Sequence, residues 1–265
     1  MSKSVSTSTA TPHPAATVVL LRDSPDGPEV FMVRRHQGTA FMGGAHVFPG
    51  GGVDAADREG ADEAVAFRIA AGRELFEEAG ILLARDENGR FVSLAGAETH
   101  ERFKIYRHEI HAGTRPLRAV LERERLRLAL DALVPFAHWV TPAIEPRRYD
   151  TRFFVVRVPA EQTPAHDEME TTASLWLTAR AALDKCRHDE IVLPPPTWTT
   201  LREIEPFKSV DEVLVWARAR RIVRREPAFA EEGGEKMLLL PDEPSLLETR
   251  FVLSNGRWRA EPART

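Results

Sequence analysis

RELFEEAG, residues 73–80, places three glutamates at the spacing of one helical face. Glu74, Glu77 and Glu78 stand at positions i, i+3 and i+4, which lie within an arc of about 100° on an α-helix. In an isolated helix, like charges at these spacings repel by about 0.2–0.5 kcal/mol per pair. Either the three carboxylates form a solvated face, or a positive charge beside them offsets the repulsion.

The residues around this segment have the periodicity of an amphipathic helix. Apolar or small residues share one stripe, and four glutamates share the opposite side. Gly80 follows the stripe and is predicted to cap the helix in the left-handed conformation. The stripe consists of Val65, Ile69, Gly72, Leu75, Phe76 and Ala79, and the opposite side of Glu63, Glu74, Glu77 and Glu78.

Two strands and a glycine-rich loop are predicted before this helix. The runs at 16–22 and 28–35 are apolar and β-branched, and the turn sequence DSPDG separates them. Glycines then stand at positions 43, 44, 50, 51 and 52. Because glycine lacks a side chain, such a loop allows the backbone to approach another group closely.

The remainder of the chain alternates between strand and helix patterns. The segment 99–134 is charged and predicted to be a helical cover. Strands interspersed with helices favour a single α/β-layered domain at 16–255, between a disordered tail at 1–15 and a C-terminal tail at 256–265. Further predicted elements are strands at 81–85, 136–142 and 151–158, a strand and helix at 174–186 capped at Thr178, a proline-entered helix at 193–204, a helix from the Ser209–Glu212 capping box to about Arg221, and a hairpin at 236–259.

Composition excludes several classes of protein. The net charge of −4 gives no basic footprint for nucleic acid, and no apolar run approaches the roughly 18 residues that cross a bilayer. The single cysteine, Cys186, excludes an intrachain disulfide and a multi-cysteine metal site. The N-terminal residues lack the apolar core of a secretory signal, so a cytoplasmic location is predicted. Neither His46 nor Cys186 has the partners that nucleophilic catalysis requires, and both are predicted to be packing residues.

Clustered carboxylates beside a glycine loop also suit a metal site. Hard divalent cations such as Mg²⁺ and Mn²⁺ take oxygen ligands and are commonly shared between carboxylates and substrate phosphates. Such a cation would remove the repulsion among the glutamates, polarise phosphoryl oxygens and lower the pKa of a bound water. The predicted cofactor is therefore Mg²⁺ or Mn²⁺.

The glycine loop and the acidic helix together resemble the signature of the Nudix hydrolase family. The matching residues are Gly51, Arg73, Glu74, Leu75, Glu77, Glu78, Gly80 and Ile81. The resemblance implies an α+β fold, a three-layer α/β/α sandwich with a mixed β-sheet, and a small-molecule nucleotide diphosphate as the substrate. It also implies that Glu77 and Glu78 are metal ligands and that Glu74 is a further ligand or the general base. Arg73 would orient these acids through an ion pair.

Two departures from the family signature stand between the loop and the helix. The acid that follows Gly51 is Asp57 instead of a glutamate, and 15 residues instead of seven separate it from Arg73. We place the resulting insertion of eight residues at 58–65. Because this segment lies between the loop and the helix, the predicted metal face is unchanged.

Motifs outside the signature resemble the branch of the family that contains the animal coenzyme A diphosphatase. They are HVFPGG, HWVTP, RRYDT, LPPPTW and LLLPDE, which begin at residues 46, 138, 147, 193 and 238. The likeness implies cleavage of coenzyme A or an acyl-CoA to adenosine 3′,5′-bisphosphate and 4′-phosphopantetheine. Ala40 counts against it, because the compact coenzyme A signature of other members has an arginine there. Two alternatives stay open, namely a pyrophosphatase for ADP-ribose, NAD(H) or dinucleoside polyphosphates, and a non-catalytic nucleotide-sensing domain.

Residues elsewhere in the chain are predicted to complete the site. In this family a loop glutamate often serves as the base or an extra ligand, and Glu170 matches it best, with Glu168 as the second choice. An exposed acidic loop is the alternative for both. The predicted substrate-binding residues are Gly50, Gly51, Arg35, Arg147 and Arg148, with an exposed position at the end of a strand or in a turn as the alternative for the arginines. No nucleic acid or membrane partner is predicted, and a homodimer stays open.

Overall fold

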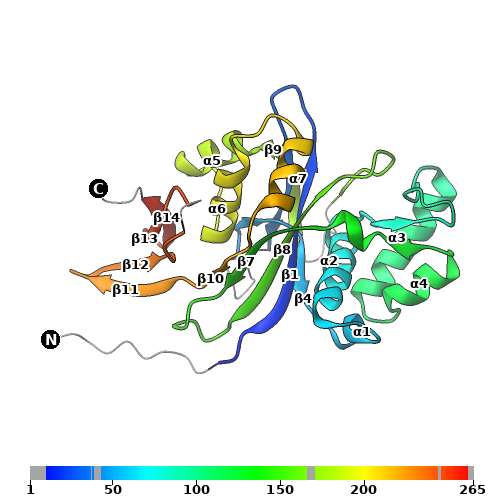
Figure 1. Ribbon diagram of the computed structural model, residues 1–265, viewed down its shortest axis with the longest axis horizontal. Helices are drawn as coiled ribbons and strands as arrows, with labels where there is room; N and C mark the ends of the chain where they lie inside the picture. The colour runs from blue at the N-terminus through cyan, green and yellow to red at the C-terminus, as the bar shows by residue number, and fades with distance from the viewer. Residues whose placement is uncertain (1–9, 37, 39–42, 166–170, 244–245, 262–265) are drawn as a thin grey trace.

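A mixed β-sheet lies at the centre of the molecule (Figure 1). The computed structural model describes residues 10–36, 38, 43–165, 171–243 and 246–261, and eight strands within these residues form the sheet. In the order of the sheet they are β10 (Arg224–Arg225), β7 (Val134–Val140), β8 (Tyr149–Arg157), β1 (His13–Arg22), β2 (Glu29–Arg35) and β3 (His46–Val47), with β4 (Gly50–Gly52) paired to β1 and β9 (Thr171–Thr178) paired to β2. The pairs β1–β8 and β7–β10 are parallel, and the other pairs are antiparallel.

The central strand β1 is buried on both of its faces. Val18 and Leu20 belong to one apolar cluster, and Val19 and Leu21 belong to another. Successive side chains point to opposite faces of a sheet, so a strand that is covered on both sides must be apolar at almost every position. This is why the predicted strand at 16–22 reads as a nearly continuous apolar run.

Helix α2 (Glu63–Ala79) covers one face of the sheet. Asp62 caps its start by accepting a hydrogen bond of 2.8 Å from the backbone N–H of Val65. Gly80 ends the helix with a φ of 69°, which confirms the predicted left-handed cap. The helix packs against β1, β2 and β8 through Phe67, Ala70, Ala71, Leu75 and Ala79.

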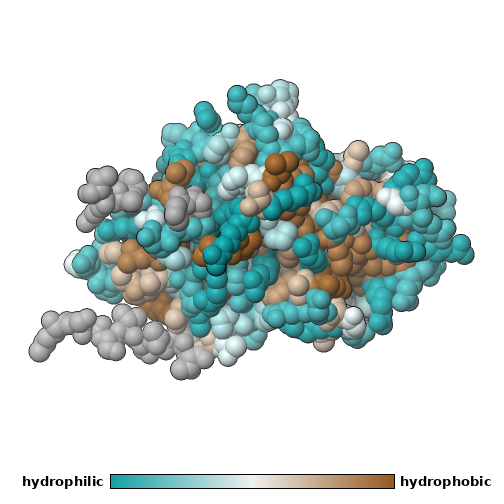
Figure 2. Space-filling view, in the orientation of Figure 1, coloured by the Kyte–Doolittle hydropathy of each residue, from teal (hydrophilic) through white to brown (hydrophobic). Residues whose placement is uncertain are grey.

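Two further helices pack against α2, away from the sheet. They are α3 (Ala97–His111) and α4 (Leu117–Arg123), which bury Phe103 and Val120 in one cluster with Phe76 of α2. In Figure 2 the surface of this part of the molecule is mainly hydrophilic. Both helices thus turn their apolar sides inward, against α2.

Three helices cover the opposite face of the sheet. They are α5 (Ala179–Arg187), α6 (Pro195–Ile204) and α7 (Val210–Ala219). Thr178 and Ser209 cap α5 and α7, as the sequence predicts, by accepting backbone hydrogen bonds of 3.2 and 3.3 Å. Helices on both faces confirm the predicted three-layer α/β/α sandwich. No helix in the described part of the chain is long and apolar enough to cross a membrane.

A second sheet of four antiparallel strands follows α7, where the sequence predicts one hairpin. Its strands are β11 (Ala228–Glu232), β12 (Glu235–Leu239), β13 (Arg250–Ser254) and β14 (Arg257–Glu261). Arg225, which is 1% exposed, fixes this sheet to α6. Its guanidinium donates hydrogen bonds of 2.7 Å to Glu203 on α6 and of 2.7 Å to Glu243 after β12. We call β11–β14 the C-terminal sheet.

The segment after α4 differs from the predicted helix. Residues 124–133 contain a short strand, β6 (Arg127–Leu128), which pairs with β5 (Ala84–Arg85), and a 3₁₀ turn at Leu130–Ala132. Arg125 adopts a φ of 53°, which interrupts a right-handed helix. Leucines at 126, 128 and 130 alternate with other residues, which is the period of a strand.

The predicted outer boundaries also differ from the observed strands. β1 begins at His13, inside the predicted tail at 1–15, and β14 ends at Glu261, inside the predicted tail at 256–265. Both strands are held by backbone pairing, β1 to β8 and β14 to β13. Of the strand predicted at 81–85, only the two residues of β5 form a strand. Ile81, Leu82 and Leu83 are buried but lie in a loop.

His46 on β3 is buried, in agreement with its predicted packing role. It is 7% exposed, and its Nδ1 atom has no hydrogen-bond partner among the described residues. Burial, with a smaller contribution from the nearby Arg34, lowers the pKa of His46 to about 4. The imidazole is therefore neutral in the folded protein at pH values where a histidine in the unfolded chain is already charged.

We expect the stability of the protein to fall as the pH drops from about 6.5 to about 4. In this range the unfolded chain binds a proton at His46 and the folded protein does not, which costs up to about 3 kcal/mol. His46→Gln should flatten this part of the profile in urea denaturation at a series of pH values. The control is His100→Gln, at an exposed position of α3; equal profiles for His46→Gln and the wild type would contradict the assignment.

Candidate active site

The guanidinium of Arg73 is the centre of a buried ion-pair cluster in the second half of α2. Arg73 is 8% exposed, and each of its five N–H bonds has an acceptor. Nη1 donates to Glu74 at 2.8 Å and to Glu77 at 2.9 Å, Nη2 donates to the carbonyl of Gly52 at 2.7 Å and to Asp57 at 2.9 Å, and Nε donates to Asp57 at 3.1 Å. A basic side chain therefore offsets the repulsion among the acids of this helix.

The charge of Arg73 is maintained by its carboxylate partners. Burial alone would lower the pKa of Arg73, but the hydrogen bonds and charges of Asp57, Glu74 and Glu77 outweigh it and raise the pKa. A permanently charged, planar group with five fixed donors is well suited to hold several carboxylates in one geometry.

Asp57 meets Arg73 although 15 residues separate them in sequence. The short helix α1 (Ala55–Arg58) carries Asp57, which is 2% exposed and also accepts a hydrogen bond of 2.9 Å from the backbone N–H of Asp54. The residues predicted as an insertion, 58–65, form the end of α1, a turn and the first residues of α2. The ion pair between this acid and Arg73 is thus retained despite the longer connection.

The glycine strand β4 lies directly against the acids of α2. The backbone N–H of Gly50 donates a hydrogen bond of 2.9 Å to Glu78. A Cβ atom at Gly51 would lie under 3.0 Å from the carboxylate of Glu74, and one at Gly50 would lie under 3.0 Å from the backbone of β1. A Cβ atom at Gly52 would meet nothing within 4 Å. The close approach therefore requires glycine at positions 50 and 51.

Two glutamates of α2, Glu77 and Glu78, are buried and Glu74 is partly buried, so these three acids do not form a solvated face. Glu77 and Glu78 are 8% and 7% exposed. Burial raises the pKa of Glu77, and the hydrogen bond from Arg73 acts in the opposite direction. Helix α3 contributes to this burial, because Nδ1 of His111 lies 3.7 Å from Glu77 and Arg107 donates to the Glu77 carbonyl at 2.7 Å.

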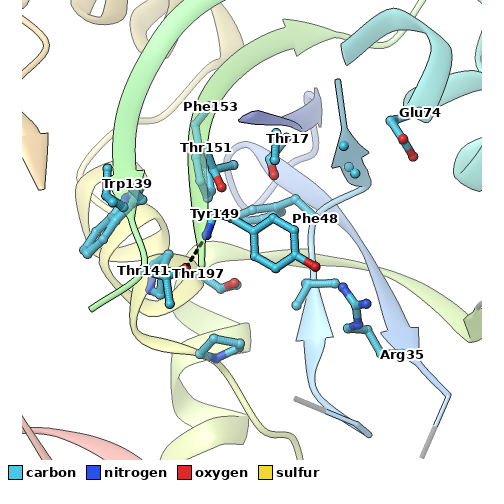
Figure 3. A pocket seen from close by; sticks show the side chains of 18 of the residues that line it. Thr17, Arg35, Phe48, Glu74, Trp139, Thr141, Tyr149, Thr151, Phe153 and Thr197 are labelled. Atoms are coloured by element: carbon cyan, nitrogen blue, oxygen red, sulfur yellow. Dashed lines mark hydrogen bonds between the residues drawn. The ribbon is translucent and has the colours of Figure 1, made fainter. Parts of the chain in front are cut away.

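A cavity of about 470 Å³ begins at these acids. Glu74, Glu77 and Glu78 line it together with all three residues of β4. Figure 3 shows Glu74 on one side of the cavity, with Thr17 of β1 and Arg35 of β2 also reaching it. Each of the five motifs outside the family signature contributes to the lining, for example Phe48, Trp139, Tyr149, Pro195 and Leu238. The fold therefore gathers segments that are far apart in sequence around one space.

The predicted arginines have different positions. Arg35 lines the cavity, whereas Arg147 and Arg148 are not among the described residues that line it. Arg148 is buried, and its guanidinium donates to the carbonyls of Thr141 and Ala10 and to Glu226 at 3.1, 3.0 and 2.5 Å. It thus has a structural role in place of the predicted phosphate contact. Arg147 is exposed and stacks on Tyr149, a cavity residue, at 5.7 Å.

Some of the predicted residues lie outside the described part of the chain. Glu170, its substitute Glu168, and Ala40 are among them. Conversely, no sequence motif pointed to His111 or Trp258, both of which line the cavity. His111 follows a charged helical run without a motif, and Trp258 lies on the second sheet, so only the fold relates them to the acidic helix. The half-buried Cys186 is not among the residues that line this cavity.

The donor set at the acidic end fits a hard divalent cation. Glu74, Glu77 and Glu78 offer carboxylate oxygens from one end of the cavity, which is the ligand chemistry that such cations prefer. Within the described ranges, however, no three His, Cys, Asp or Glu side chains form a ready-made metal-binding group. Arg73 donates to two of the three glutamates, and Gly50 donates to the third. A bound cation would have to share or replace part of these contacts.

We expect Asp57→Asn to destabilise the protein by about 3 kcal/mol, because it removes the charge that opposes a buried arginine. Urea denaturation measures this loss. Asp54→Asn is the matched control, since Asp54 lies 3.6 Å from the same guanidinium with a side chain that is 68% exposed. This variant should lose less than about 0.5 kcal/mol. Similar losses in the two variants would show that burial of the Asp57 pair does not stabilise the fold.

Comparison with known proteins assigns this fold and site to a family. The sequence model of the NUDT19 Nudix domain matches residues 59–204, which is more than half of the chain. The acyl-coenzyme A diphosphatase NUDT19 of Xenopus laevis is 26% identical over 234 residues, covering 70% of this chain and 62% of that protein. The putative nudix hydrolase 7 of Caenorhabditis elegans is 29% identical over 249 residues, covering 88% of this chain and 77% of that protein.

A solved structure gives the same assignment. The crystal structure of a Nudix hydrolase from Alicyclobacillus acidocaldarius aligns with a TM-score of 0.70 and 28% sequence identity, covering 78% of this chain and 97% of that one. The fold, the acidic helix with its glycine strand, and the sequence relatives agree. The chain therefore belongs to the Nudix hydrolase family and is similar to the acyl-coenzyme A diphosphatases within it.

Proposed function

We propose that this protein hydrolyses the diphosphate of coenzyme A or an acyl-CoA in a metal-dependent reaction. The observation that carries the proposal is that one cavity joins the buried acids of α2 to a wall of aromatic and proline residues. Water would attack one phosphorus of the diphosphate and break its bond to the bridging oxygen. The products would be adenosine 3′,5′-bisphosphate and 4′-phosphopantetheine, the latter still carrying any acyl group. The names of the Xenopus and other vertebrate relatives support this substrate class.

Nudix hydrolases generally use divalent metal ions, and Mg²⁺ or Mn²⁺ is the cofactor we propose for this chain. Glu74, Glu77 and Glu78 would hold it. When bound, the cation polarises phosphoryl oxygens and lowers the pKa of a coordinated water. Arg73 donates hydrogen bonds to Glu74 and Glu77, and the bond to Glu77 opposes the burial that raises the pKa of that carboxyl.

Several residues of the chain have separate roles in this proposal. Arg73 positions Glu74 and Glu77 through its two hydrogen bonds. Gly50 and Gly51 let the backbone approach the diphosphate, and Arg35 would bind a phosphate oxygen as a charge-assisted donor. The general base is Glu74 or Glu170. Because a base must first be within reach of the attacking water, the choice between them depends on the position of the bound substrate.

A panel of diphosphates tests this substrate assignment. Coenzyme A, its acetyl and longer acyl thioesters, ADP-ribose, NADH and a dinucleoside tetraphosphate are compared with Mg²⁺, with Mn²⁺ and with a chelator, and the products are identified by mass. We expect the coenzyme A compounds to have the highest kcat/KM and the chelator to abolish hydrolysis. Equal or faster cleavage of ADP-ribose or NADH would contradict the coenzyme A assignment, and tight binding of intact ligand with metal present would indicate a non-catalytic domain.

We expect Gly51→Ala to reduce hydrolysis by about 100-fold, because the new methyl group displaces the carboxylate of Glu74 and small misplacements of this size are costly to catalysis. The obstructing atoms belong to the end of a flexible side chain, so the fold should remain intact by circular dichroism. Gly52→Ala, whose added carbon meets nothing within 4 Å, is the control and should retain wild-type activity. Similar activities of the two variants would show that the contact between Gly51 and Glu74 does not matter for the reaction.

A further inference from the structure

The acids of α2 lie on one side of the cavity, and uncharged, mostly apolar residues, which we call its apolar end, line another part of it. All of its acidic and basic lining residues, and His111, lie before residue 146 in the chain. In Figure 3, Glu74 lies on the opposite side of the cavity from Trp139 and Thr197. The lining residues after Leu193 are uncharged, and all except one are apolar; they are Pro194, Pro195, Pro196, Thr197, Pro227, Leu238 and Trp258.

Much of the apolar wall belongs to the C-terminal sheet. Leu238 lies on β12 and Trp258 on β14, and Pro227 immediately precedes β11. These residues follow residue 204, where the match to the NUDT19 Nudix domain ends. The buried ion pairs of Arg225 hold this sheet against α6, whose first residues supply the prolines of the wall. The apolar end is therefore a fixed part of the fold.

Trp139 adds an aromatic ring to this wall. It is 3% exposed and lines the cavity, and its indole N–H has no acceptor among the residues that the structure describes. Buried donors are usually paired, and leaving one without an acceptor costs free energy. Since the indole N–H is itself buried, what this residue contributes to the wall is its ring.

We propose that the apolar end binds the S-acyl chain of an acyl-CoA and that Trp258 determines the preference for chain length. The proposal rests on the function proposed above. An acyl-CoA carries charge at its diphosphate and hydrocarbon at the far end of its pantetheine arm, which is the polarity of the cavity. Each methylene that enters the apolar end should tighten binding by up to about fourfold.

The test compares kcat/KM for coenzyme A, octanoyl-CoA and dodecanoyl-CoA in the wild type, Trp258→Ala and Leu239→Ala. Leu239 neighbours Leu238 on the same strand but is 38% exposed and is not among the lining residues, so it serves as the matched control. We expect the wild type to prefer dodecanoyl-CoA. Trp258→Ala should lose about tenfold or more on dodecanoyl-CoA and stay within about twofold of the wild type on coenzyme A. Leu239→Ala should behave as the wild type.

Direct binding separates this inference from the proposed reaction. S-dodecanoyl-pantetheine lacks the diphosphate, and its binding to the wild-type protein is measured by calorimetry, without any need for turnover or for a folded variant. If S-dodecanoyl-pantetheine binds but no coenzyme A compound is hydrolysed, the proposed reaction is refuted and the apolar site is supported. Hydrolysis that is independent of chain length, together with no binding of S-dodecanoyl-pantetheine, would overturn the inference alone. An equal loss on all three substrates in Trp258→Ala would also overturn it.

Discussion

The acidic end of the cavity depends on one buried guanidinium. Arg73 uses all five of its donors, on Asp57, Glu74, Glu77 and the carbonyl of Gly52. The four acceptors belong to α1, α2 and the glycine strand β4, so a single charge determines how these three segments meet. An acidic helix that would otherwise repel itself is thereby packed into the interior.

The same arrangement has a consequence for metal binding. Arg73 donates to Glu74 and Glu77, and the Gly50 N–H donates to Glu78, so each of the three glutamates already has a hydrogen-bond donor in the folded protein. An arriving cation competes with a guanidinium and a peptide N–H for carboxylate oxygens. Burial, which raises the pKa of Glu77, disfavours leaving these acids without a positive neighbour. In the proposed reaction, the carboxylates, the glycine backbone and the cavity would therefore already be in place when metal and substrate bind.

The sequence predicts the parts of the fold that are governed by local chemistry. The period of α2, its Gly80 cap, the Thr178 and Ser209 caps and the strands on both sides of the glycine loop all follow from residues close to one another in the chain. The period-two leucines at 126–130 carried a strand signal as well, but the surrounding charges resembled a helix. The three-layer architecture followed from the family resemblance and from the order of these elements.

The remainder of the site depends on contacts between distant segments. Arg148 could have been a phosphate ligand or a structural residue, and the decision rests on Glu226, 78 positions away. Likewise, no local pattern relates Trp258 on the second sheet, or His111 at the end of α3, to the glutamates of α2. Long-range packing of this kind is specified by the whole fold, so the cavity and its apolar end could not be read from the order of residues.

The most direct measurement is Mn²⁺ binding, followed by electron paramagnetic resonance, to the wild type and to Glu78→Gln. Glutamine can still accept the hydrogen bond from Gly50, so the fold is preserved while one charged oxygen donor is lost. If the α2 carboxylates hold the cation, Mn²⁺ affinity should weaken by at least about tenfold, since even changes in residues that support ligands cost this much. Hydrolysis should fall with it. Unchanged Mn²⁺ affinity together with unchanged turnover would show that the acids of α2 are not the metal site.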